Sequence, residues 1–260
     1  LRVFEEVDLN PNRYILQWYH QRGSGTPQAL RMALNRQSDT RVERDFYEGR
    51  FRRDPRPDSF LEWARNWDHG RISALLQTQL NPFFDSVERL PEIQLDLYRR
   101  RLGKTPLYYE SQTQVGFYKK RFTQPGLMDY DARRADTWHQ VSMPTKVSPW
   151  VQWIPHVGVR GASYSETSGA GGGLDAVERA SLHAGADITA KAVRTWENAK
   201  LDTFSIDGLR HIVRPAIRYA YLTTPNVDPS EIPQFDTDFA NFEMPLFHFP
   251  ERNTIDALDA

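Results

Sequence analysis

The sequence predicts an all-β fold: an antiparallel up-and-down meander of about ten strands, of the kind that forms part of a larger transmembrane β-barrel of the outer-membrane type. Three observations predict it. Apolar side chains recur at every second position in one segment after another, which is the period of a β-strand. Short turns alternate with long polar loops, and Trp and Tyr gather near the ends of the predicted strands.

The individual strands follow from this alternation. In residues 71–80, Ile72 and Leu76 fall on one side of an extended chain, and Ser73 and Gln77 fall on the other. The same pattern predicts strands near residues 13–22, 29–38, 59–68, 71–80, 91–100, 105–122, 130–143, 149–164, 180–198 and 210–222.

Residues 174–198 also allow a helical reading, because Leu174, Val177 and Ser181 have helical spacing. The unbroken alternation from Leu182 to Ala192 favours a strand.

The predicted connections differ in length. Short turns fall at residues 68–70, 101–104 and 144–148, and longer polar loops at residues 39–58, 81–90, 123–129, 165–179 and after 223. Short turns at one end of a meander and long loops at the other are typical of outer-membrane barrels.

A soluble β-sandwich also alternates, with one face in its core and one in water. Strands longer than the usual ~5–6 residues favour a membrane crossing. So do interfacial aromatic residues, which place a ring in hydrocarbon and a polar tip among headgroups. The aromatic clusters are Trp18 and Tyr19, Trp63 and Trp67, Tyr108 and Tyr109, Trp150 and Trp153, and Tyr219 and Tyr221. The sequence pattern alone gives the membrane barrel and the soluble β protein nearly equal support.

The amino-acid composition excludes further classes of protein. The aromatic content of 12% is too high for a disordered chain. The formal net charge of −1 argues against a nucleic-acid partner, and no apolar run approaches the roughly 18 residues of a membrane helix. The chain has no Cys, which excludes a disulfide framework and a thiolate metal site. It begins at Leu1 without an initiator Met and ends in a polar stretch. We therefore expect residues 1–260 to be an incomplete domain cut from a longer protein.

We expect no catalytic residue, cofactor or metal. None of the His residues has the spacing of a zinc motif. His183, Asp187 and Lys191 share a predicted strand face, which fits a hydrated lumen wall better than a catalytic cluster.

Other patterns are equally weak. The Gly169–Gly173 run reads as a loop tip, because it lacks the Lys-Ser/Thr of a phosphate loop. Two carboxylates such as Asp58 and Glu62 could serve glycoside hydrolysis. The chain has 34 acidic residues, so such pairs are expected by chance and carry little weight. Inward Arg214 and Arg218 could face an anionic ligand, although pairing with acidic residues is the simpler reading.

Several segments, in order, resemble the LptD family, also called organic solvent tolerance proteins. They are Arg13–Gln21, Ser38-Asp39 with Arg44–Tyr47, Trp63–Asp68, Val87–Ile93, Leu209–Tyr219, Ile232–Asp236, and Arg252-Asn253 with Ile255-Asp256. Within them, the positions that match the family's motifs are Ser38, Asp39, Leu90, Pro91, Arg210, His211, Pro215, Tyr219, Ile232, Pro233 and Asp236.

The resemblance implies a lipopolysaccharide translocon in the outer membrane of a Gram-negative bacterium, with a barrel that opens laterally. The implied partners are lipopolysaccharide, outer-membrane lipid, an LptE-like lipoprotein in the lumen and a periplasmic LptA-like bridge. The bridge would bind an N-terminal jelly-roll that lies outside this sequence, as do the final barrel strands. The motif residues are expected to be architectural, since Pro91 and Pro215 would disturb ladder pairing. The alternatives are a general outer-membrane porin or transporter barrel, and a soluble all-β carbohydrate-binding or glycoside-active protein.

Overall fold

The computed structural model describes residues 12–236 apart from residues 24, 53, 55, 202, 204 and 205. Its strands are β1 (Ile15–Arg22), β2 (Gln28–Gln37), β3 (Ser59–Trp67), β4 (Gly70–Thr78), β5 (Ser86–Arg101), β6 (Tyr108–Arg121), β7 (Tyr130–Ser142), β8 (Thr145–Ser148), β9 (Val151–Tyr164), β10 (Val177–Ala190), β11 (Ala192–Leu201), β12 (Ile206–Val213) and β13 (Ala216–Leu222). Two short helices, α1 (Val42–Phe46) and α2 (Glu48–Phe51), and the 3-10 helix η2 (Pro229–Glu231) complete the fold.

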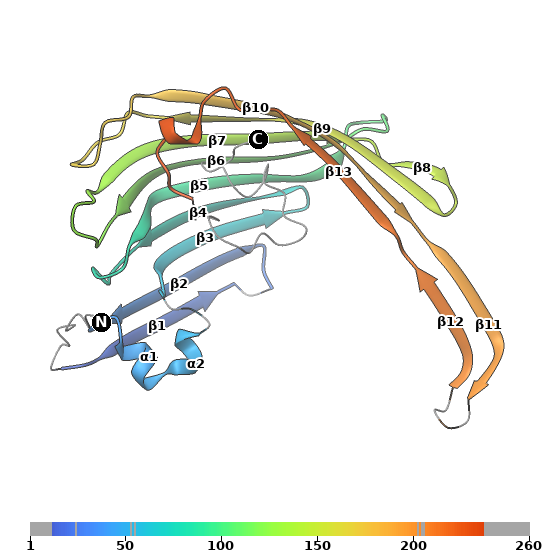
Figure 1. Ribbon diagram of the computed structural model, residues 1–260, viewed down its shortest axis with the longest axis horizontal. Helices are drawn as coiled ribbons and strands as arrows, with labels where there is room; N and C mark the ends of the chain where they lie inside the picture. The colour runs from blue at the N-terminus through green and yellow to red at the C-terminus, as the bar shows by residue number, and fades with distance from the viewer. Residues whose placement is uncertain are drawn as a thin grey trace, which may run out of the picture.

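Most of the strands form one curved antiparallel sheet (Figure 1). The sheet has 11 strands in the order β1-β2-β3-β4-β5-β6-β7-β9-β10-β13, with β8 paired to β9, while β11 and β12 form a separate two-stranded ribbon. The predicted all-β antiparallel meander is confirmed. Among the described residues the barrel is not closed, because β1 and β13 lie at opposite edges of the sheet.

Most predicted strands are confirmed within a few residues of their bounds, and the strand reading of 174–198 is confirmed over its helical alternative. Three expectations were wrong in detail. Residues 145–148 form β8 where a plain turn was expected, and β5 already begins at Ser86, inside the predicted loop 81–90. The last two predicted strands are each broken in two, at Lys191 and at Arg214-Pro215.

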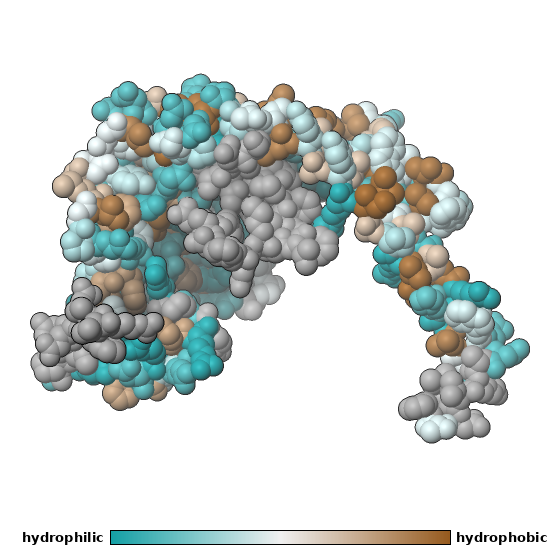
Figure 2. Space-filling model, in the orientation of Figure 1, coloured by the Kyte–Doolittle hydropathy of each residue, from teal (hydrophilic) through white to brown (hydrophobic). Residues whose placement is uncertain are grey.

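The break at Pro215 has a backbone cause. Proline has no N–H to give to a ladder, and its carbonyl oxygen instead accepts a hydrogen bond of 3.0 Å from the N–H of Ala190. Beyond this point β11 and β12 leave the sheet as a ribbon (Figure 1). Figure 2 shows hydrophobic and hydrophilic residues interspersed along that ribbon.

The strand registers divide the sheet into two unlike faces. Because side chains alternate across a strand, directly paired residues share a face. One face, here called the polar face, carries Arg31, Glu62, Arg71, Gln94, Asp96, Gln114, Arg134, Asp136, Arg160, Arg179, Asp187 and Arg218. The other, the apolar face, carries Trp18, Leu34, Leu61, Trp63, Leu76, Ile93, Leu95, Val115, Val157, Val159, Leu182, Ile188, Ile217 and Tyr219. Apolar side chains that stay exposed, such as Ile217 at 65%, are what a lipid-facing surface requires.

A bulge in β5 preserves this division. Arg89 pairs with Tyr118 and Glu92 pairs with Gly116, so Leu90 and Pro91 together oppose one residue of β6. The same two residues oppose one residue of β4. Two residues against one is the definition of a β-bulge. As a result Arg89 and Glu92, three positions apart, both lie on the polar face.

The small core lies against the polar face at the end of the sheet that carries the long loops. The segment after β13 packs there. Ile232 is buried against Ala162 and Tyr164, and Phe235 is buried against Tyr118 and Ala132. No helix among the described residues has the length and apolar character needed to cross a bilayer.

Candidate functional site

The candidate site is the polar face, because the charged side chains gather there in pairs. Asp136 on β7 accepts two hydrogen bonds from Arg160 on β9, at 2.9 and 3.0 Å. Glu62 on β3 forms ion pairs with Arg31 and Arg71 from the strands on either side. A fork of guanidinium N–H groups matches the two carboxylate oxygens, so these pairs tie neighbouring strands together.

The middle of the polar face is closely packed. The rings of Trp138 and His183 stack with centroids 5.6 Å apart and planes 6° apart. Gln140 donates to Glu110 at 2.8 Å, and its other amide atom lies 3.3 Å from Nε2 of His183. The sequence grouped His183 with Asp187 and Lys191. The structure places His183 and Asp187 on the polar face, whereas Lys191 lies outside the strand, at the junction of β10 and β11.

In the predicted motif at Ile232, Pro233 and Asp236, the first two residues are buried against the polar face and Asp236 is partly exposed beside them. The carboxylate of Asp236 accepts a hydrogen bond of 2.9 Å from Arg134, whose guanidinium lies 4.6 Å from the centre of the Tyr118 ring. The backbone carbonyl of Gln234 accepts hydrogen bonds from Lys120 and Tyr130, both at 3.0 Å. The segment therefore bridges β6 and β7 through main-chain, ionic and apolar contacts.

A second motif cluster lies at the same end of the sheet, around Asp39. Arg13 donates two hydrogen bonds to the Asp39 carboxylate, at 3.0 and 3.1 Å. Arg13 also pairs with Asp45 at 3.0 Å, and its guanidinium lies 5.0 Å from the centre of the Phe46 ring. Ser38 accepts a hydrogen bond from the N–H of Tyr14 and donates one to Asp39.

Burial alone would raise the pKa of Asp39. The hydrogen bonds from Arg13, Ser38 and the backbone of Arg41 act in the opposite sense, and the resulting pKa of Asp39 lies below its ordinary value.

The motif residues from 210 to 219 are not brought to these clusters. Arg210 and His211 are exposed on β12, paired with Thr195 and Arg194 of the ribbon. Pro215 lies in the break between β12 and β13, and Tyr219 lies on the apolar face with 63% of its surface exposed. The motif positions Arg252, Asn253, Ile255 and Asp256 lie outside the described residues.

The residue patterns that suggested chemistry do not assemble a reactive centre among the described residues. No three His, Asp or Glu side chains there are placed to hold a metal ion. Asp58 accepts from Gln77, and the pKa of its carboxyl is raised by burial and by nearby Asp54. Its supposed partner Glu62 is engaged by two arginines.

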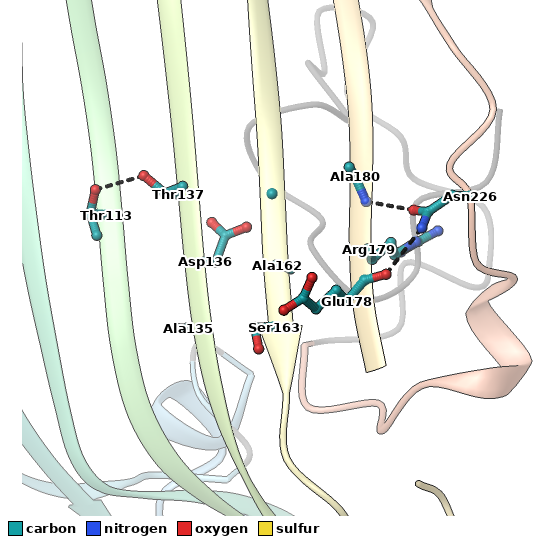
Figure 3. A pocket seen from close by; sticks show the side chains of 11 residues that line it. Thr113, Ala135, Asp136, Thr137, Ala162, Ser163, Glu178, Arg179, Ala180 and Asn226 are labelled. Atoms are coloured by element: carbon teal, nitrogen blue, oxygen red, sulfur yellow. Dashed lines mark hydrogen bonds between the residues drawn. The ribbon is translucent and has the colours of Figure 1, made fainter. Parts of the chain in front are cut away.

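A cavity of about 600 Å³ lies elsewhere, and Figure 3 shows its lining. Thr113, Ala135, Thr137 and Ser163 take part, and these residues share the apolar face with Val115. The hydroxyls of Thr113 and Thr137 hydrogen-bond to each other at 2.8 Å. The lining also includes Asp136 and Arg179 of the polar face, together with Glu178 and Asn226.

The model of one known family, described as LptD, LPS transport system D, matches residues 11–248. The chain belongs to the LptD family. No protein in a search of curated proteins matches it. The LptD match decides against the general porin and the soluble carbohydrate-active protein. LptD proteins transport lipopolysaccharide to the outer membrane, so this chain is an outer-membrane transport component that handles lipopolysaccharide within the Lpt system.

Sequence reasoning missed several contacts that define the site in this LptD chain. Arg13 pairs with the motif residue Asp39, Arg134 pairs with the motif residue Asp236, and Phe235 stacks on Tyr118 beside Asp236. Arg13 and Phe235 lay inside quoted motif segments, so those segments did contain a signal. Nothing in the sequence near Arg134 indicated its distant partner.

Proposed function

We propose that this LptD chain is an incomplete wall of a transmembrane β-barrel whose polar face lines a hydrated path for lipopolysaccharide. The observation that carries the proposal is the division of one continuous sheet into a polar and an apolar face. Lipid-facing and lumen-facing residues alternate in this way in outer-membrane barrels.

The polar face suits a phosphorylated glycolipid headgroup. Its arginines are matched by carboxylates, as in Arg160–Asp136 and Arg134–Asp236. Matched pairs keep the wall hydrated without a large net field. Acyl chains would leave through a lateral opening in the wall, while the headgroup stays in contact with the polar face.

The edges of the described sheet, β1 and β13, would be continued by strands outside the described residues. An LptE-like lipoprotein would occupy the lumen, and a periplasmic LptA-like bridge would deliver lipopolysaccharide through an N-terminal jelly-roll domain. The chain does no covalent chemistry in this scheme.

The motif residues are proposed to act as architecture. Leu90 and Pro91 keep the register of β5, Ser38 and Asp39 hold the loop after β2, and Ile232, Pro233 and Asp236 fasten the segment after β13. Pro215 ends β12, Tyr219 faces lipid, and Arg210 and His211 belong to the ribbon.

Single cysteines test the topology, and this sequence has no native Cys to remove. Gln94 and Leu95 are adjacent on β5 and lie on opposite faces. In the full-length protein in outer membranes, a water-soluble maleimide should label Gln94→Cys, and a lipid-soluble reagent should label Leu95→Cys. Equal labelling of both by the water-soluble reagent would exclude the membrane wall.

A photo-reactive residue at the same two positions tests the path. At position 94 it should crosslink lipopolysaccharide while synthesis continues and lose that product soon after synthesis is stopped. At position 95 it meets resident lipid, so its products should not depend on fresh supply. If the crosslinked product at position 94 persisted after lipopolysaccharide synthesis was stopped, this would argue against transport along the polar face.

A further inference from the structure

A second cavity lies at the opposite end of the sheet from Asp236, where the short turns are. Its volume is about 340 Å³, and it is bordered by β8, β9, β10 and β13. Three cationic side chains line it: Lys146, Lys191 and Arg214. Trp150 and the hydroxyl-bearing Ser148 and Thr189 also take part.

The strand registers explain why these residues meet. Lys146 pairs with Gln152, Gln152 pairs with Thr189, and Thr189 pairs with Ala216, so a single row of residues crosses four strands on the polar face. Lys191 follows Thr189 by two positions, and Arg214 precedes Ala216 by two. The N–H of Lys191 donates to the carbonyl of Trp150 at 2.9 Å, which holds the junction of β10 and β11 against the turn after β8.

The charge of this pocket is unlike that of the rest of the polar face. No Asp or Glu lines it. Within the part of the chain that the structure describes, none of its three cationic side chains has an ion pair. The nearest polar-face acid on β10, Asp187, lies 3.7 Å from Arg218. Several arginines elsewhere on the polar face are paired with acids, as Arg160 is with Asp136, whereas the lining of this pocket holds three positive charges and no acid.

We propose that this basic pocket binds the phosphoryl groups of lipopolysaccharide at the turn end of the polar face. The proposal rests on the proposed function and adds a substrate contact to it. The guanidinium fork of Arg214 can bind two phosphate oxygens at once, and the two lysines act as point charges. Trp150, exposed over 63% of its surface, offers a ring face and an N–H for the attached sugar. The three cations come from separate parts of the chain: Lys146 from β8, Lys191 from the junction of β10 and β11, and Arg214 from the break between β12 and β13.

Binding by the full-length protein tests the proposal. The pocket variant carries Lys146→Gln, Lys191→Gln and Arg214→Gln. The control variant carries Arg22→Gln, Arg100→Gln and Lys104→Gln, which removes the same charge from exposed positions at the same end of the sheet. The probes are purified lipopolysaccharide, the same lipopolysaccharide after enzymatic removal of its phosphates, and phosphatidylglycerol vesicles.

The pocket variant should bind phosphorylated lipopolysaccharide about tenfold or more weakly than the wild type, as loss of charge-assisted hydrogen bonds predicts. It should bind the dephosphorylated form like the wild type, and the control variant should behave like the wild type with all probes. Lys191→Arg should retain binding.

Three outcomes would overturn the proposal: no loss, an equal loss in the control variant, or an equal loss toward phosphatidylglycerol vesicles. An equal loss in the control variant would indicate general electrostatic attraction. An equal loss toward phosphatidylglycerol vesicles would indicate a general surface for anionic lipid. The substituted side chains are exposed, so folding should be intact, and the heat-dependent mobility of each variant checks this. Crosslinking of lipopolysaccharide at position 94 tests the path separately, so a failed pocket and a failed path are distinguishable.

Discussion

Arg134 and Asp236 form an ion pair of 2.9 Å although they lie 102 positions apart in the chain. Arg134 is buried to 2% exposure, and its guanidinium lies over the Tyr118 ring. This pair fastens the segment after β13 to β7 beside the buried ring of Phe235.

Removing one partner of this pair should cost more than removing both. Asp236→Ala leaves a buried guanidinium without its carboxylate, and such a loss costs about 3–5 kcal/mol. The double variant Arg134→Met/Asp236→Ala removes the buried charge as well and should be less destabilised. Urea unfolding of the full-length protein in lipid bilayers measures both. Equal or greater loss in the double variant would show that the pair does not fasten the segment.

Asp39→Asn should reduce stability at neutral pH and should have less effect in acid. The folded-state pKa of Asp39 is lowered, so its contribution is complete above the unfolded pKa of about 3.9 and is lost as pH falls through the folded pKa. The stability difference between wild type and variant should therefore be constant above about pH 5 and should shrink at lower pH.

Asp175→Asn is the control for this pH series, since Asp175 is an exposed loop residue. It should leave the pH profile of stability unchanged. A difference between wild type and Asp39→Asn that persists at the lowest pH would show that Asp39 acts through packing and not through its charge.

Deleting Pro91 should be tolerated, whereas deleting Ile93 should not. Removing one bulge residue from β5 leaves Arg89 and Glu92 on the same face of a regular strand. Removing Ile93 makes Glu92 and Gln94 adjacent and forces half of the strand to turn its polar side chains toward lipid. A charged side chain on the lipid face costs up to about 2–4 kcal/mol. The yield of folded, heat-modifiable protein in the outer membrane measures both deletions, and equal yields would contradict the register argument.

Gly158→Ala should be destabilising, with Gly161→Ala on the same strand as its control. A Cβ at Gly158 would lie 2.2 Å from the carbonyl oxygen of His139 and 2.3 Å from the His183 ring. A Cβ at Gly161 would meet nothing within 4 Å. Overpacking costs about 1–3 kcal/mol, while the control should stay within about 0.5 kcal/mol. Unfolding midpoints in urea compare the two, and similar midpoints would show that β9 and β10 adjust freely at this point.

Most strands and both sheet faces could be predicted from the amino-acid sequence, because a period of two directly specifies which side chains share a face. The alternation through residues 71–80 and the placement of His183 with Asp187 on one face are both confirmed. The LptD resemblance is confirmed by the family match over residues 11–248.

The positions at which strands divide, bulge and are joined to distant segments could be seen only in the folded chain. Pro215 was expected to disturb ladder pairing, but the sequence did not show that the strand would divide into β12 and β13 there. The bulge at Leu90 and Pro91 depends on how two neighbouring strands meet β5. The pairing of Arg134 with Asp236 and the grouping of Lys146 with Arg214 join distant parts of the chain. Local alternation specifies a face, but it carries no information about which distant residue will lie opposite, since that depends on the register of every strand between them.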